Sequence, residues 1–256
     1  KGLKMQAKPI VLCILDGWGL STSHTGNAPA QAHTPTIDHI METFPHSTLI
    51  THGPNVGLPK KQMGNSEVGH TNIGAGRIVA MDLGQIDLAI ETGAFKKNSA
   101  LNVFVEKLKS SGGTAHILSL LSDGGVHGQF SHLIATLTLL NEHNIPAALH
   151  IVADGRDVAP KSIVTYLTQL QDKMPPNTFI ATLTGRYYTF DRDNRWERVK
   201  DAYEAMVHGT SAQHFESAEK AIDAGYQNGK SDEFLPASVI GHYKGVRDGD
   251  GLFCLN

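Results

Sequence analysis

Ser66 stands in a stretch whose residue types could do chemistry, QMGNSEVGHTNIGAG at residues 62–76. Serine and asparagine are preferred helix caps, because their side-chain oxygens accept the free amide groups of the first helical turn. A serine can also be a nucleophile when a base, a lowered pKa or a metal ion activates it. His70 and Asn72 follow Ser66 closely. The stretch alone leaves both interpretations open, a cap and a nucleophile.

Three polar segments each follow an apolar run that predicts a β-strand. They are SDGGVH at 122–127, DGRD at 154–157 and GRYYTFDRDNR at 185–195. Ligands of open α/β sheets bind beyond the carboxyl ends of the strands, so these segments should meet at one edge. Arginine matches phosphate and carboxylate groups bidentately, which predicts a small, multiply anionic ligand. By itself, each segment fits an ordinary turn, and an arginine that follows a strand is usually solvated. Three such segments at one edge of a sheet favour a binding site.

Asp16 directly follows an apolar run at 9–15. A carboxylate is a hard oxygen ligand of the kind that Mg²⁺ and Mn²⁺ prefer, and a bound metal ion can activate a hydroxyl group. The GNSEVG sequence is not a G-x-S-x-G nucleophile elbow, and no Ser-His-Asp spacing is recognisable. His70 and His127 are possible ligands, although the chain has 14 histidines. The residues alone predict a serine phosphoenzyme candidate beside an anion-binding domain.

The elements that must position these residues follow from the hydrophobic pattern. In the first part of the chain we expect a buried strand at 9–15, a helix from Pro35 to about Phe44 and a β segment near 47–52. After about Met81 the pattern becomes a regular alternation, with strands at 115–121, 147–153 and 178–183 and helices at 130–142, 161–172 and 194–207. Such alternation is typical of an α/β fold with a parallel sheet.

Composition narrows the class of protein. The chain has 256 residues, enough for one large domain or two ordinary ones, and a formal net charge of −3. That charge provides no general field for nucleic acid, which is a poor first candidate for a partner. No apolar run reaches the roughly 18 residues of a membrane span, and no secretory segment is recognisable, so we expect a cytoplasmic protein. The two cysteines make no disulfide framework, and the leading KGLK is set aside as a tail.

The chain resembles the cofactor-independent phosphoglycerate mutases of the alkaline phosphatase superfamily. The matching motifs are LDGWG at 15–19, MGNSEVGH at 63–70, SDGGVH at 122–127, DGRD at 154–157 and GRYYTFDRDNRWERV at 185–199. The resemblance implies two domains. Residues 1–81 would be the N-terminal portion of an alkaline-phosphatase-like, metal-binding domain. Residues 82–256 would be an inserted α/β phosphotransferase domain with a mostly parallel sheet, incomplete at its C-terminal end.

The resemblance also implies roles for single residues. Asp16 matches a metal-binding aspartate, and Ser66 matches the serine that both ligates metal and receives the phosphoryl group. Asp157 is the candidate acid/base at the hydroxyl groups of the substrate. The substrate-binding positions that match are His127, Arg156, Asp157, Arg186 and Arg192. The chain has His-Gly-Gln at 127–129 where His-Ser-His is more usual, so a second histidine contact is not carried over.

In that family, 3-phosphoglycerate and 2-phosphoglycerate interconvert through a phosphoserine. The resemblance implies two divalent ions, Mn²⁺ or Mg²⁺, no 2,3-bisphosphoglycerate, and a monomer in the full-length form, with no nucleic-acid or membrane partner. Family members are longer, and their later part supplies most metal ligands. We therefore expect this chain to be an N-terminal half that is inactive alone. Two alternatives stay open: a metal-dependent phosphatase of the same superfamily, and a non-catalytic phosphoglycerate-binding fragment.

Overall fold

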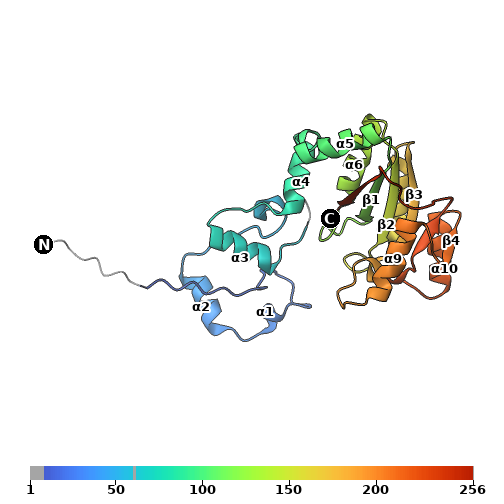
Figure 1. Cartoon of the computed structure of the whole chain (residues 1–256). Helices are drawn as coiled ribbons and strands as arrows, with labels where there is room; N and C mark the ends of the chain where they lie inside the picture. The colour runs from blue at the N-terminus through green and yellow to red at the C-terminus, as the bar shows by residue number, and fades with distance from the viewer. Residues whose placement is uncertain (1–8, 60–61, 256) are drawn as a thin grey trace. The chain divides into compact units, whose positions relative to one another are not determined.

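The computed structural model describes residues 9–59 and 62–255. The KGLK tail, Lys60, Lys61 and Asn256 lie outside the described residues. Contacts divide the chain between Ala80 and Met81 into two compact units, whose elements are labelled in Figure 1. None of the helices in the described part of the chain is both long and apolar enough to cross a membrane.

The first unit is built from short helices. They are α1 (Ala28–Gln31), α2 (Pro35–Thr43), the 3₁₀ helix η1 (Gly53–Val56) and α3 (Ser66–Ala75). The helix predicted from Pro35 is confirmed, and its proline occupies the first turn, where its missing N–H group costs no hydrogen bond.

The two strands predicted in the first unit are wrong. Residues 9–15 and 47–52 form no strand, and the Ile10 and Val11 side chains are 96% and 87% exposed. An apolar run of this kind becomes a strand only when a neighbouring strand accepts and donates its backbone hydrogen bonds. No other segment among the described residues of this unit pairs with either run. The hydrophobic pattern therefore identifies apolar residues in these runs but does not determine their secondary structure.

The second unit contains a six-stranded sheet with the order β4-β5-β3-β2-β1-β6. The pairs β1–β2, β2–β3, β1–β6 and β4–β5 are parallel, and only β3–β5 is antiparallel. Figure 1 shows β1, β2 and β3 side by side. The predicted α/β class with a mostly parallel sheet is confirmed. The strands are β1 (Ala115–Leu120), β2 (Ala147–Ala153), β3 (Thr178–Gly185), β4 (Gln213–Phe215), β5 (Ser238–Ile240) and β6 (Gly251–Leu255).

Helices connect these strands, and the three predicted ones are confirmed within two residues. The helices of the second unit are α4 (Asp82–Glu91), η2 (Phe95–Lys97), α5 (Ser99–Ser111), α6 (Phe130–Glu142), α7 (Ile163–Lys173), α8 (Arg186–Thr189), α9 (Trp196–His208), α10 (Ala218–Gln227) and η3 (Asp232–Phe234).

The main core lies on one face of the sheet. Ile117 of β1, Leu149 of β2 and Leu183 of β3 are fully buried there and pack with α5, α6, α7 and α10. Each such side chain contributes about 1.5–3 kcal/mol on burial. Helix α9 packs on the opposite face. A sheet anchored on both faces holds the carboxyl ends of its central strands in fixed positions, and these ends carry the polar segments.

Candidate functional site

In the first unit, Ser66 and Asp16 are in direct contact. The Ser66 hydroxyl donates to Asp16 Oδ2 at 2.6 Å, and His70 Nδ1 lies 3.2 Å from Ser66 Oγ. His70 Nδ1 also lies 2.8 Å from the Ser66 carbonyl oxygen, one helical turn back. All three side chains are exposed to solvent. The structure thus brings together two of the sequence-predicted residues, with a histidine beside them.

Ser66 is not the helix cap that the sequence suggested. The N-cap of α3 is Asn65, which has extended backbone angles and whose side chain accepts from the Val68 amide at 3.0 Å. Ser66 is the first helical residue. Its hydroxyl is therefore released from capping and is available to Asp16. A helix N-terminus favours negative charge, so a phosphoryl group on Ser66 would be in a favourable place.

Neighbouring residues explain why this short segment is so rich in glycine and asparagine. A Cβ added at Gly64 would lie 1.8 Å from the Thr51 carbonyl oxygen, so only glycine allows the chain to approach so closely before α3. Asn72 donates to the Val56 carbonyl and accepts from the Val79 amide. These contacts hold α3 against η1 and against the segment that follows α3.

The Asp16 and Ser66 oxygens suit a hard divalent cation in type but not in number. Mg²⁺ takes six ligands, mostly oxygens, and usually keeps several waters. No group of three His, Cys, Asp or Glu side chains that could hold a metal occurs within residues 9–59 and 62–255. The hydroxyl and the carboxylate, with His70 close by, therefore do not make up a complete metal site by themselves.

In the second unit, a buried arginine joins the loops that follow two strands. Arg186, at the end of β3, is 5% exposed. Its Nη1 donates to Asp154 Oδ1 and to Asp157 Oδ2, both at 2.6 Å, in the loop that follows β2. Ser122, which follows β1, donates to Asp154 Oδ2 at 2.7 Å. The expected meeting of three strand ends is what the structure shows.

The electrostatics of this cluster favour its charged forms. Burial by itself would raise the pKa of Asp154, but hydrogen bonds from Ser122, from two backbone amides and from Arg186 outweigh it and hold that pKa below its usual value. Burial likewise opposes the Arg186 charge, yet its bonds to Asp157 and Asp154 raise the Arg186 pKa. Asp154 is therefore a carboxylate and Arg186 a guanidinium at neutral pH, with one positive charge placed between two carboxylates.

The remaining sequence-predicted residues lie around this cluster with more exposure. Arg192 Nη2 lies 3.0 Å from His127 Nε2, which brings the loops after β1 and β3 together. Arg156 is mostly exposed and faces Glu233 at 3.7 Å, a weak ion pair. Glu233 belongs to η3, and sequence reasoning missed it because it comes from a segment distant from every motif.

Close backbone approach places η3 against the loops. A Cβ at Gly185 would lie 2.3 Å from the Glu233 carbonyl oxygen. Gly155 has a φ of +66°, and its Cβ would lie 2.8 Å from the Asp232 Cβ. Asp232 in turn accepts from the amides of Ser162 and Ile163, where α7 begins. Packing thus requires the two glycines of the DGRD and GRYY motifs, where the sequence pattern by itself indicates only ordinary turns.

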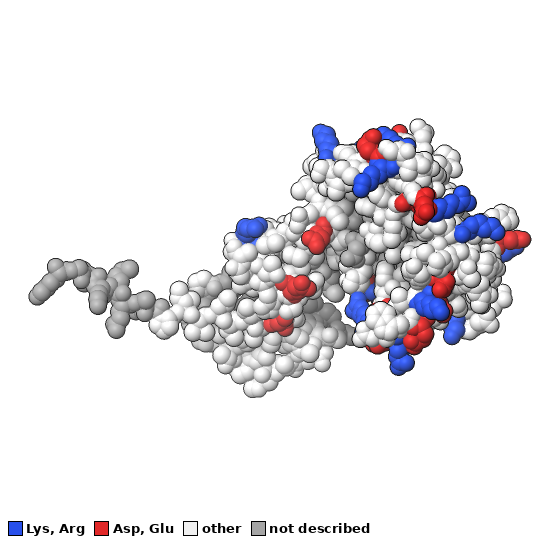
Figure 2. Space-filling model, viewed as in Figure 1, with Lys and Arg blue, Asp and Glu red and all other residues white. Residues whose placement is uncertain are grey.

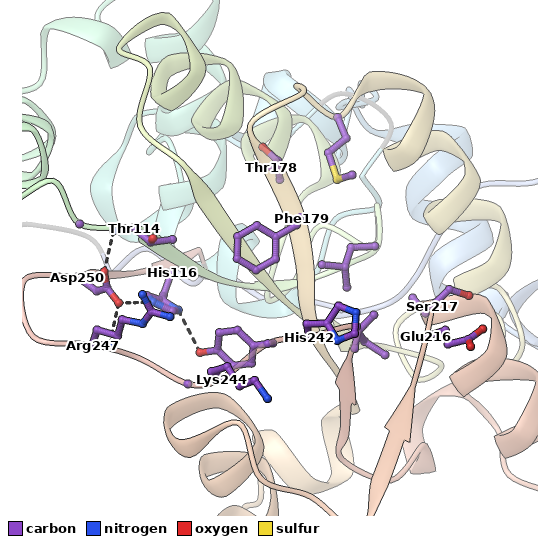
Figure 3. A pocket seen from close by; sticks show the side chains of 18 of the residues that line it. Thr114, His116, Thr178, Phe179, Glu216, Ser217, His242, Lys244, Arg247 and Asp250 are labelled. Carbon is purple, nitrogen blue, oxygen red and sulfur yellow. Dashed lines mark hydrogen bonds and ion pairs between the residues drawn. The ribbon is translucent and has the colours of Figure 1, made fainter.

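A separate cavity of about 730 Å³ opens near the amino ends of β1 and β3, between Thr114 and Thr178 (Figure 3). His116, a buried residue that lines the cavity, lies 3.2 Å from the Asp250 carboxylate and 2.9 Å from His150. The cavity lining mixes basic and acidic side chains, among them Lys244 and Glu216, and so it lacks the concentration of arginines found at the other strand ends.

The distribution of charge on the surface differs from that expected of a polyanion-binding protein. On the face drawn in Figure 2, basic and acidic side chains alternate over the second unit instead of gathering into one basic surface. A localised arginine cluster fits a small anion better than a long one.

The fold and these contacts define the second unit as an α/β domain with arginines and carboxylates gathered at the carboxyl edge of a parallel sheet. Residues 86–256 match the family described as BPG-independent PGAM N-terminus. The chain belongs to this family.

Curated relatives agree with the family assignment. The chain is 58% identical over 249 residues to a 2,3-bisphosphoglycerate-independent phosphoglycerate mutase of Ruegeria pomeroyi, and 57% identical to the enzyme of the same name in Roseobacter denitrificans. Each alignment covers 97% of this chain and 49% of the relative. The chain therefore spans about half the length of the curated relatives that it matches.

A solved structure is similar as well. It is a Leishmania mexicana phosphoglycerate mutase crystallised at low cobalt concentration, with a TM-score of 0.71 and 31% sequence identity. The match covers 88% of this chain and 44% of that one.

Proposed function

We propose that this chain is part of an enzyme that interconverts 3-phosphoglycerate and 2-phosphoglycerate through a phosphoserine at Ser66. The names of the curated relatives support the reaction. The observation that carries the proposal is the 2.6 Å contact between Ser66 Oγ and Asp16 Oδ2, at the N-terminus of α3. Residues 1–81 would be the N-terminal portion of a phosphatase-like domain, and residues 82–256 the substrate-binding domain.

Asp16 and Ser66 would hold one of two divalent ions, Mn²⁺ or Mg²⁺, together with ligands from outside the described residues. Such an ion supplies Lewis-acid stabilisation of phosphoryl charge and lowers the pKa of a bound hydroxyl group. The chain's own contribution is to orient the hydroxyl. Ser66 Oγ donates its proton toward Asp16 Oδ2, and the α3 N-terminus favours the negative charge that arrives on the serine.

The second unit would hold glycerate while the phosphoryl group moves. Arg156, Arg192 and His127 are exposed or half-buried and would bind the carboxylate and phosphate groups of the substrate. Asp157, whose Oδ2 accepts from Arg186, would take and return a proton at the glycerate hydroxyl groups. Confinement of dephosphorylated glycerate would keep transfer ahead of hydrolysis.

The proposal has further parts that rest on the resemblance. The full-length enzyme would be a cytoplasmic monomer that needs no 2,3-bisphosphoglycerate. The 256-residue chain alone would bind phosphoglycerate without turning it over, because Asp16 and Ser66 are too few ligands to retain a catalytic ion.

The test is an assay of the natural-length protein with 3-phosphoglycerate and manganese. We expect 2-phosphoglycerate as the product, with little free phosphate. Release of free phosphate without the 2-isomer would replace the mutase by a phosphatase. The 256-residue chain, assayed beside it, should give neither product; turnover by that chain near the natural-length rate would contradict the half-enzyme interpretation.

A further inference from the structure

At the strand-end cluster, the Asp154 carboxylate accepts four hydrogen bonds, and its side chain is only 1% exposed. Its Oδ1 accepts from Arg186 Nη1 at 2.6 Å and from the amides of Arg156 and Asp157 at 3.2 and 3.0 Å. Its Oδ2 accepts from Ser122 Oγ at 2.7 Å. One carboxylate thus accepts hydrogen bonds from residues that follow β1, β2 and β3.

Burial separates the role of Asp154 from that of its neighbour. Asp157, 20% exposed, faces the same Arg186 nitrogen and can still reach a ligand. Asp154, almost fully enclosed, cannot touch a ligand unless the loops open. Its contribution must pass through the groups that it holds, which are the Arg186 guanidinium and the backbone that carries Arg156 and Asp157.

We propose that Asp154 is a positioning residue for phosphoglycerate binding, because it fixes Arg186 between two carboxylates and ties the loops after β1 and β2 to it. This inference rests on the proposed function. Without Asp154, Asp157 would be the remaining ionic partner of Arg186 Nη1 among the described residues. The amides of the DGRD loop would lose their shared acceptor. The loop after β1 lies directly against this loop, since a Cβ at Gly124 would be 3.1 Å from the Asp157 Cβ.

The sign of the effect separates positioning from charge. Phosphoglycerate is an anion, so removing a nearby negative charge should strengthen its binding by Coulomb attraction alone. If Asp154 positions the site, Asp154→Asn should weaken binding in spite of the added net positive charge. Asp123→Asn is a matched control, because it removes the same charge one residue after Ser122, and Asp123 accepts from Tyr166 instead of Arg186.

The experiment is a titration of the 256-residue chain with 3-phosphoglycerate, followed by backbone amide NMR shifts, for wild type and each variant. Circular dichroism and thermal melting establish that each variant is folded. We expect Asp154→Asn to weaken binding at least tenfold, and Asp123→Asn to leave it unchanged or slightly tighter. Asp154→Glu restores the charge but displaces the oxygens, so it should not restore affinity.

Ser122→Ala provides a milder second variant if Asp154→Asn fails to fold. It removes one hydrogen bond to Asp154 Oδ2 and keeps every charge, and it should weaken binding by several fold. Wild type that binds, together with Asp154→Asn or Ser122→Ala that binds equally or more tightly, would overturn the positioning role. Wild type that does not bind at all would overturn the proposed binding of phosphoglycerate by the 256-residue chain, and this inference with it.

Discussion

The hydroxyl group of Ser66 lies 2.6 Å from the carboxylate of Asp16, although fifty residues separate them along the chain. The contact does not depend on a hydrogen bond from Ser66 to its own helix, because Asn65 provides the cap of α3. The side chain that holds the helix end and the side chain proposed to do chemistry are thus adjacent but separate, which makes their functions separable by mutation.

Ser66→Ala in the natural-length protein should abolish conversion of 3-phosphoglycerate while changing the free energy of unfolding by less than about 0.5 kcal/mol, as for an exposed position without a cap role. Asn65→Ala should instead lower the free energy of unfolding by about 1 kcal/mol, because the Val68 amide loses its acceptor. Product assays and urea unfolding measure the two effects. Retention of a tenth of wild-type turnover by Ser66→Ala would count decisively against its role.

Arg156→Ala should weaken binding of 3-phosphoglycerate to the 256-residue chain by about tenfold or more, since a charge-assisted hydrogen bond contributes about 1.5–3 kcal/mol. Arg195→Ala is the matched control: both side chains are 60% exposed, and each faces a glutamate at nearly 4 Å. Calorimetry at two salt concentrations should show wild-type affinity falling with salt. Equal losses in the two variants would mean that general surface charge, and not the Arg156 site, holds the ligand.

Stability of the second unit should fall as the pH falls below about 6.5, where an unfolded histidine titrates. Burial and the neighbouring His116 lower the pKa of His150 to about 3. Between these two values the unfolded chain therefore binds one more proton than the folded chain. Once the unfolded histidine is fully protonated, the loss is about 1.4 kcal/mol per pH unit.

Urea unfolding between about pH 6.5 and 4.5 measures this slope. His150→Gln should flatten it, while His214→Gln, at an exposed position of β4, should not. An unchanged slope in His150→Gln would show that another group takes up the proton.

The central part of the second unit was predictable because buried parallel strands carry their own signal. The run 147–153 is apolar except for His150 and is buried along its whole length, and β2 begins and ends where the sequence indicates. Strands β4 and β5 have three residues each, too few to produce a pattern. The run at 9–15 shows the converse, since its apolar residues were recognised but no described segment pairs with them.

The candidate site, like the fold, was predictable only in part. Arg186 and Asp157 were expected to meet because strand ends in a parallel sheet share an edge, and the structure brings them to 2.6 Å. The sequence did not predict that Asp154 accepts hydrogen bonds from three loops, or that Glu233 lies near Arg156 and Gly185. Both features depend on which atoms of the folded loops come into contact. The position of Asp154, directly after a buried strand and at the start of DGRD, was the available signal for its burial.

The central claim is that Ser66 accepts the phosphoryl group, and mass spectrometry of the natural-length protein tests it most directly. The protein is incubated with 3-phosphoglycerate and manganese, quenched in acid and digested, and the peptide that contains residues 62–76 is sequenced. The account predicts one added phosphoryl group on Ser66, absent from Ser66→Ala. Phosphate on a different residue, or full turnover without any phosphoserine under conditions that trap the intermediate, would contradict it.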